Sequence, residues 1–216
     1  MSESISARPD TSDMAAVHQV FRSSLSSAPE FVASAAGDDE RRALIASYYA
    51  NLMAFLKVHH EGEEALVFAL LIERALEHRS ILDTAASQHH DVADRITAVD
   101  DAVSAWAAQG DAHAPKLVRG LGALDEALSP HLDREEEIVP LAGAHLTVEE
   151  WGMLPGHAMA NFGADKIWLI IGLIRESFTS HQRDAMLEKM SPPRQMWGTM
   201  GEASFDTMIA TVRQTA

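Results

Sequence analysis

Two short stretches of the chain combine histidine and glutamate at helical spacing, HHEGEE beginning at His59 and HLDREEE beginning at His131. His59 and Glu63 are four residues apart and would share one face of a helix. The same holds for His60 and Glu64, so the first stretch has two registers. Imidazole nitrogens and carboxylate oxygens, with no thiolate, together suit iron or manganese. The pattern indicates a metal site, with a solvated acidic face as the alternative.

The elements that must position these residues are amphipathic helices. Apolar residues recur at three- and four-residue steps, and alternating β-branched runs are absent. A first helix follows the DTSD cap signal and ends near Pro29, a second opens at GDDERR, a third covers 81–108, and a fourth stops near Pro140. Four such helices joined by short connections predict an all-α, antiparallel up-and-down four-helix bundle over residues 1–146.

Residues 147–216 form a predicted helical extension packed on the bundle. TVEE has the pattern of a capping box, LPG is a breaker, and an apolar helix follows around residues 165–178. SPP separates two further short helices near the end of the chain. The surface of IWLIIGLI is a candidate partner interface, and the extension is a candidate site of homodimerisation.

Each predicted apolar stripe passes through a histidine. In the second helix the stripe runs through Phe55, Leu66 and Leu70, which selects the register of His59 over that of His60. The same extension of the stripes in all four helices selects the inward polar residues His18, His59, Glu63, His89, His131 and Glu135.

Two of these inward residues are glutamates, and a buried carboxylate is costly unless it is paired or bound to a cation. A lone inward histidine is usually a hydrogen-bonded core residue, but four on one seam with two glutamates favour a metal. If both carboxylates bridge two ions, the six donors fill about eight of roughly twelve octahedral positions. Room remains for dioxygen, peroxide or nitric oxide.

The pattern of His18, HHEGEE, the histidine of QHHDVADRI and HLDREEEIVPL resembles the hemerythrin-like, or HHE cation-binding, family. The resemblance covers about the first two thirds of the chain. It implies a non-haem di-iron centre of the Fe–O–Fe type inside a four-helix bundle, with manganese or zinc able to substitute. The family pattern maps onto the same six residues that the stripes select.

The third helix departs from the pattern of the oxygen-carrying members, which have two histidines one turn apart. Here Ala93 lies four residues after His89, and Asp94 lies four after His90. A small rotation of this helix would exchange His89 for His90. The loss of one histidine implies a more open metal, and so favours redox reactivity or sensing over simple oxygen carriage.

Several neighbours of the predicted ligands have two interpretations. Gly62 either leaves room for a metal or packs closely against another helix, at a cost of about 1 kcal/mol relative to alanine in a helix. Glu64 could orient a ligand, although solvation is expected. His60 is expected to lie beside the site. His157 could supply a ligand or cover the centre, and otherwise is a surface or core histidine.

The expected function is that of a non-haem di-iron protein that binds or reacts with dioxygen, peroxide or nitric oxide in stress response or sensing. Peroxide decomposition is the enzymatic version, and no catalytic residue is assigned. The alternative is a non-enzymatic iron-binding or iron- and oxygen-sensing module that acts through a partner protein.

The composition excludes several classes of partner and ligand, and it indicates the cellular compartment. A formal charge of −15 argues against nucleic acid and anionic membranes. No cysteine is present, so thiolate ligands and disulfides are excluded. The start of the chain lacks a secretory pattern, and the longest apolar run is too short to cross a bilayer. These features predict a soluble protein of the cytoplasm.

Overall fold

The computed structural model describes residues 8–163, 166–189 and 197–214, and every regular element within them is helical. The prediction of an all-α protein is confirmed. The elements in the first two thirds of the chain are α1 (Asp13–Ser26), α2 (Ala28–Ala33), α3 (Asp39–Gly62), η1 (Glu63–Phe68), α4 (Ala69–Arg74), η2 (Leu76–His78), α5 (Arg79–Gln109), η3 (Asp111–His113) and α6 (Ala114–His145). They are followed by α7 (Val148–Trp151), α8 (Met153–Asn161), α9 (Ile167–Ser177), α10 (Ser180–Lys189), η4 (Trp197–Gly201) and α12 (Glu202–Val212).

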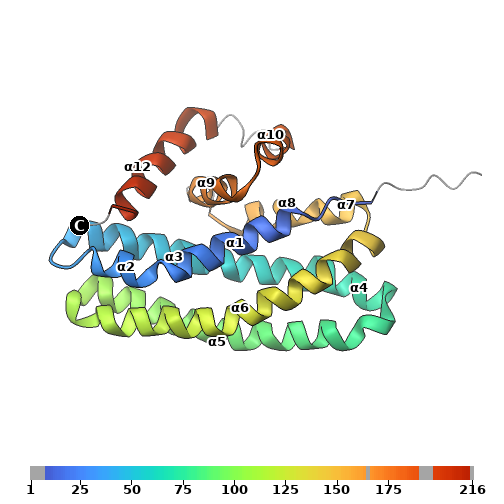
Figure 1. The fold of residues 1–216 in the computed structure, drawn as a ribbon, viewed down its shortest axis with the longest axis horizontal. Coiled ribbons are helices and arrows are strands. Elements are labelled where there is room, and N and C mark those ends of the chain that lie inside the picture. Colours follow the sequence, from blue (N-terminus) through green and yellow to red (C-terminus); the bar gives the residue numbers. More distant parts are fainter. Residues whose placement is uncertain (1–7, 164–165, 190–196, 215–216) are drawn as a thin grey trace, which may run out of the picture.

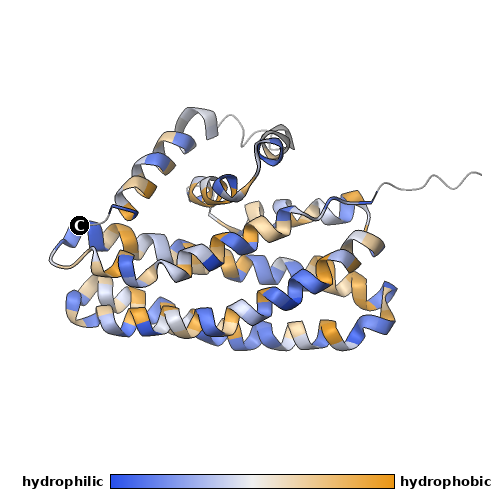
Figure 2. Ribbon diagram, in the orientation of Figure 1, coloured by the Kyte–Doolittle hydropathy of each residue, from blue (hydrophilic) through white to orange (hydrophobic). Residues whose placement is uncertain are grey.

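Four long helical segments lie side by side, and the chain reverses direction from each to the next (Figure 1). They are α1, the continuous run from α3 through η1 to α4, α5 and α6. Apolar residues concentrate between them, while blue, hydrophilic positions lie on the outside (Figure 2). Asp38 caps α3 by accepting a hydrogen bond from the backbone N–H of Arg41, so GDDERR opens the second helix as predicted.

Apolar residues that recur along the third and fourth predicted helices lie in the core. Val92, Ile96 and Val99 of α5 are buried, and so are Leu117, Leu121, Leu124 and Leu128 of α6. Between α1 and α3 the contact is aromatic: the rings of Phe21 and Phe55 lie 5.3 Å apart. These contacts fix the spacing of the helices that carry the histidines.

The second long segment changes register at η1, which is a π-helix. A π turn holds more residues than an α turn, so positions beyond it rotate relative to an uninterrupted helix. Val67, Phe68 and Leu71 are buried, whereas Leu66 and Leu70 are only partly so. The predicted stripe through Leu66 and Leu70 is therefore displaced by one residue.

The fourth helix does not stop near Pro140, as the sequence pattern suggested. α6 continues to His145 with Pro130 and Pro140 inside it. Both prolines are exposed, so a carbonyl that loses its helical partner lies on the solvent side. Pro29 behaves as expected in ending α1, but it also sits in the first turn of α2.

The helices after α6 cover one side of the long helices (Figure 1). The capping box predicted at TVEE is present: Thr147 accepts from the Glu150 N–H, and Glu150 accepts from the Thr147 N–H. LPG does not break a helix, because Leu154 to Gly156 lie inside α8. α8 packs along α3, and α9 packs along α1. Ser191 to Pro193, the predicted SPP separator, lie outside the described residues.

The apolar run IWLIIGLI is core of this same chain. Leu169, Ile170, Ile171 and Leu173 are buried in α9, in one cluster with Phe21 and Phe55. The idea that this run forms a partner surface is therefore wrong for these side chains. The division of the chain at residues 146 and 147 stays a prediction, as does homodimerisation. Among the described residues, no helix is long and apolar enough to cross a membrane.

Candidate metal centre

The six residues selected from the sequence come together between the four long helical segments. α1 contributes His18, the α3–η1 segment contributes His59 and Glu63, α5 contributes His89, and α6 contributes His131 and Glu135. The carboxylates are almost wholly enclosed, with 4% of the Glu63 side chain and 2% of the Glu135 side chain exposed. Local helical periodicity aimed each of them inward, and the packing of four helices made them neighbours.

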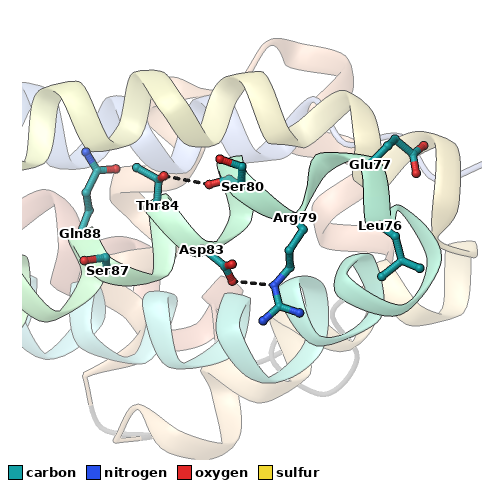
Figure 3. A pocket seen from close by; sticks show the side chains of 8 residues that line it. All are labelled: Leu76, Glu77, Arg79, Ser80, Asp83, Thr84, Ser87 and Gln88. Carbon is teal, nitrogen blue, oxygen red and sulfur yellow. Dashed lines mark hydrogen bonds and ion pairs between the residues drawn. The ribbon is translucent and has the colours of Figure 1, made fainter.

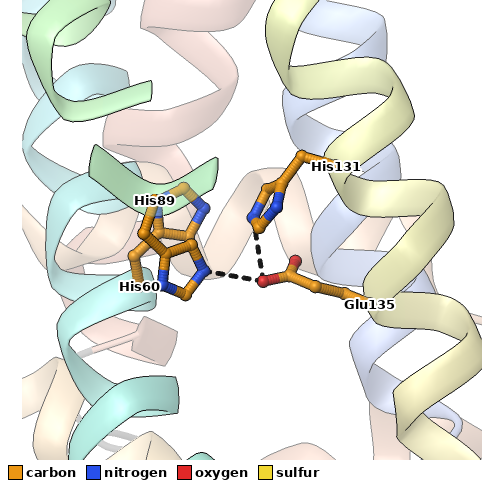
Figure 4. A group of neighbouring side chains, drawn as sticks. All are labelled: His60, His89, His131 and Glu135. Atoms are coloured by element: carbon orange, nitrogen blue, oxygen red, sulfur yellow. Dashed lines mark hydrogen bonds and ion pairs between the residues drawn. The ribbon is translucent and has the colours of Figure 1, made fainter. Parts of the chain in front are cut away.

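These side chains form two groups, and each group could hold a cation. In the first, His60, His89, His131 and Glu135 each offer one ligand atom, and these atoms lie within 4.8 Å of one another. Figure 4 shows the three imidazoles arranged around the Glu135 carboxylate. The second group meets the same distance limit with His18, His59, Glu63 and Glu135. Glu135 belongs to both groups, so two sites would share one carboxylate.

His60 lies inside this arrangement and not beside it, contrary to expectation. Its ring stacks on His89 with centroids 4.2 Å apart and meets His131 edge-on at 5.0 Å. His59, His60 and Glu63 span about a third of the helix circumference, so all three can face the centre. The stripe through Leu66 and Leu70 misled because those residues lie within or beyond the π segment. The adjacent doublet HH was the sequence signal for both histidines.

The carboxylate oxygens lie between imidazole nitrogens. Glu135 Oε1 is 2.8 Å from His89 Nε2 and 2.9 Å from His131 Nε2, and its Oε2 is 3.4 Å from His18 Nε2. Glu63 Oε2 is 3.5 Å from His59 Nε2. Glu135 therefore reaches three histidines of three different helices.

Six buried atoms of the two groups have no hydrogen-bond partner in the described part of the chain. They are His18 Nε2, His59 Nε2, His60 Nε2, His131 Nε2, Glu63 Oε2 and Glu135 Oε2. An unsatisfied buried polar atom costs about 1–3 kcal/mol. Such a concentration of inward-directed nitrogen and oxygen lone pairs fits a borderline metal ion. The donor set therefore fits the cation that the sequence pattern implies.

Burial favours the neutral form of the imidazoles, which is the form that binds metals. It lowers the pKa of His59 to about 3, with the neighbouring His18 adding to the effect. It also lowers the pKa of His18, and that of His60 lies well below its usual value. These rings are consequently neutral near pH 7, with a free lone pair on one nitrogen.

The pKa values of the two buried carboxylates are shifted in opposite directions. Burial, together with the charge of Glu135, raises the pKa of Glu63 well above its usual value. Burial also opposes ionisation of Glu135, but the His131 and His89 imidazoles, whose Nε2 atoms lie 2.9 and 2.8 Å from Glu135 Oε1, hold the pKa of this group well below its usual range. Glu135 is thus the anionic carboxylate, as its place in both groups requires.

The outward-facing Nδ1 atoms of three histidines contact acceptors. His89 Nδ1 is 2.7 Å from Glu64 Oε1, His18 Nδ1 is 3.3 Å from Glu136 Oε1, and His131 Nδ1 is 3.4 Å from Gln88 Oε1. The expectation that Glu64 is merely solvated is wrong, although its side chain remains 45% exposed. For Glu64 and Glu136 the sequence signal was that each directly follows an inward glutamate, whereas Gln88 had no such signal.

Gly62 and His157 contact each other between α3 and α8. A Cβ built on Gly62 would lie 3.1 Å from His157 Cδ2 and 3.4 Å from Leu154 Cδ2. Close packing is therefore the better interpretation of Gly62. His157 belongs to neither group, although its Nε2 is buried without a partner in the described residues. His90 is exposed and its Nδ1 lies near the Ala86 carbonyl, so α5 turns His89 inward.

A small cavity of about 10 Å³ adjoins both buried carboxylates. Such a volume holds about one water-sized molecule. Its lining is otherwise apolar, and comprises Met14, Val67, Phe68, Ile138, Val139, Ala142 and Trp151 with Glu63 and Glu135. Val67 and Phe68 enter this lining through the register change at η1.

A second hollow lies on the outside of the molecule, at the start of α5, and is open to solvent (Figure 3). Asp83 and Arg79 pair across one turn there at 2.7 Å. The lining comprises Leu76, Glu77, Arg79, Ser80, Asp83, Thr84, Ser87 and Gln88. None of the six predicted site residues lines it, so the enclosed centre is the candidate functional site.

The chain belongs to the hemerythrin family, because the model of the hemerythrin HHE cation-binding domain matches residues 10–142. This match covers all six predicted site residues together with His60, Glu64 and Glu136. α8 and His157 follow the matched region. Comparisons with curated proteins and with solved structures found no match. The protein is thus a hemerythrin-like protein with a His/Glu cluster able to bind metal.

Proposed function

We propose that this protein holds two non-haem iron ions and uses them to bind or react with dioxygen, peroxide or nitric oxide. The observation that carries the proposal is the pair of four-residue groups sharing Glu135, with six ligand atoms otherwise unpartnered in the described residues. Membership of a cation-binding family supports it independently.

The donors divide between the two positions. His60, His89 and His131 would hold one ion, His18, His59 and Glu63 would hold the other, and Glu135, which belongs to both groups, would contribute to both. Five imidazoles and two carboxylates fill about eight or nine of the roughly twelve positions of two octahedral ions. A small exogenous ligand therefore has room to bind.

The third helix contributes one histidine, and His60 adds a further imidazole from α3. With this imidazole, the metal would be less open than the missing third-helix histidine implied. Reversible binding and redox reaction both remain compatible with the donor set, and turnover measurements separate them.

The cavity beside Glu63 and Glu135 has room for about one water-sized molecule, which supports a very small ligand. Its small volume disfavours larger substrates, and its largely apolar lining favours small apolar molecules such as dioxygen or nitric oxide. The iron pair would supply the redox chemistry. The protein holds the donors, keeps the imidazoles neutral through burial, and restricts access.

Metal analysis with an optical spectrum tests the proposal. Protein produced in iron-rich medium is expected to contain roughly two irons per chain and to absorb in the near ultraviolet by ligand-to-metal charge transfer. Metal content near zero with unchanged folding would refute it. Added peroxide separates the activities: its loss with evolved oxygen defines an enzyme, and stable binding without turnover defines a carrier or sensor.

A sensor that acts through the C-terminal helices is the second candidate function. The contact of His157 with Gly62 favours it, because α8 rests directly on the α3–η1 segment, which carries His59 and Glu63. Oligomeric state is then expected to differ between the metal-free and iron-loaded protein in size-exclusion chromatography with light scattering. An unchanged mass would show that metal binding does not act through homodimerisation.

A further inference from the structure

We propose that Glu64 and Glu136 are positioning residues, each of which holds one histidine so that its inner nitrogen faces the metal. This inference rests on the proposed metal function. Glu64 Oε1 lies 2.7 Å from His89 Nδ1, and Glu136 Oε1 lies 3.3 Å from His18 Nδ1. Both glutamates stand at the rim, with 45% and 43% of their side chains exposed.

The two glutamates are equivalent in their placement. Each directly follows a buried glutamate, Glu64 after Glu63 and Glu136 after Glu135. Successive residues of a helix point about 100° apart, so the first side chain faces the centre and the second reaches a neighbouring helix. η1 thus contacts α5 through Glu64, and α6 contacts α1 through Glu136.

The two contacts serve different halves of the centre. His89 belongs only to the group with His60 and His131, whereas His18 belongs only to the group with His59 and Glu63. Each Glu-Glu doublet therefore combines a carboxylate of the centre with a carboxylate that orients an imidazole. This accounts for doublets that otherwise resemble a solvated acidic face.

The chemistry of the His89 ring explains why such a contact matters. Its Nε2 lies 2.8 Å from Glu135 Oε1 while its Nδ1 lies 2.7 Å from Glu64 Oε1. A neutral imidazole has one N–H and can donate to only one of these acceptors. A cation bound at Nε2 would leave the proton on Nδ1, and Nδ1–H would then donate to Glu64. Glu64 thereby stabilises the tautomer and ring orientation that bind metal.

Glu136 is itself held in place. The Arg22 guanidinium donates to Glu136 Oε1 at 3.4 Å and to Asp133 Oδ1 at 2.6 Å. It also donates to the Ser129 carbonyl at 3.3 Å, so α1 and α6 are tied one turn away from His18. Arg22 therefore restrains the Glu136 carboxylate that contacts the His18 imidazole.

Cobalt titration of the metal-free full-length protein tests the proposal. Glu64→Ala and Glu136→Ala are each expected to weaken binding of one Co²⁺ by about 10- to 100-fold and to change the visible absorption of that ion only. Because the variants act on different halves, their altered absorption bands are expected to differ. Glu64→Gln and Glu136→Gln keep an acceptor oxygen and should restore most of the affinity.

Glu61→Ala and Glu137→Ala are the matched controls, since both residues are exposed neighbours on the same helical segments. They should bind both ions as the wild type does. If Glu64→Ala and Glu136→Ala match these controls, or if the glutamine variants are as weak as the alanine variants, positioning is refuted. Wild-type protein that binds no Co²⁺ would overturn the proposed function instead. Circular dichroism identifies an unfolded variant, and the glutamine variant then decides.

Discussion

His60 and His89 stack face to face, with ring centroids 4.2 Å apart and an interplanar angle of 17°. The stack brings a residue of α3 and a residue of α5 to the same carboxylate, Glu135. It gives both histidines of the HH doublet a place at the centre, since His59 faces His18 with ring centroids 5.5 Å apart.

The first prediction concerns this doublet. His60→Ala and His59→Ala are each expected to lower iron content by roughly one ion per chain, because each belongs to one of the two donor groups. Metal analysis after dialysis measures the loss. His90→Ala is the control and should keep full iron content, because His90 is exposed. Retention of both ions by His60→Ala would show that only His59 of the doublet is a ligand.

The second prediction separates the two glutamates. Glu135→Ala should lose both ions, because this carboxylate belongs to both groups, whereas Glu63→Ala should mainly weaken the group with His18 and His59. Cobalt titration followed by absorption gives the stoichiometry of each variant. Equal losses in the two variants would contradict the assignment of Glu135 as the shared ligand.

Metal binding should raise stability. A ligand present at 100 times its dissociation constant stabilises the native state by about 2.7 kcal/mol when it does not bind the unfolded chain. The iron- or cobalt-loaded protein should therefore unfold at a higher temperature than the metal-free protein in calorimetry, and a chelator should reverse the shift. Coincident unfolding curves at saturating metal would contradict a site in the folded core.

The fourth prediction tests the contact between α3 and α8. Gly62→Ala would place a Cβ 3.1 Å from His157 Cδ2, so the ring must shift and stability should fall or gain nothing. In a His157→Ala background the same change should stabilise by about 1 kcal/mol through helix propensity. Denaturant unfolding measures both.

Gly122→Ala is the matched control for this experiment. Gly122 lies inside α6, is exposed, and has open space where a Cβ would stand. Alanine there should stabilise the protein by about 1 kcal/mol in either background. If Gly62→Ala changes stability as Gly122→Ala does, α8 does not pack closely against α3 at Gly62.

The fifth prediction concerns the small cavity. Ala142→Leu adds a larger side chain to its wall and should fill a space of about 10 Å³. The expected result is unchanged iron content with slower or weaker binding of nitric oxide, at a stability cost of about 1–3 kcal/mol for overpacking. Stopped-flow absorption measures the binding rate. An unchanged binding rate would show that nitric oxide does not occupy this cavity.

The sequence by itself determined the helical class and the six inward residues. Each follows from a local rule: a helix repeats every 3.6 residues, so a polar residue in register with an apolar stripe faces the core. His18, His89 and Glu135 could be selected in this way because no irregular turn separates them from the leucines and valines that define their stripes.

The tertiary structure decided what no local rule contains. The π turn at η1 rotated the residues beyond Glu63, so Leu66 and Leu70 were poor guides to the side of the helix on which His60 lies. The role of Glu64 and the fit of Gly62 depended on α5 and α8, elements distant in sequence. Periodicity fixes the direction of a side chain relative to its own helix, whereas its partners depend on how separate helices pack.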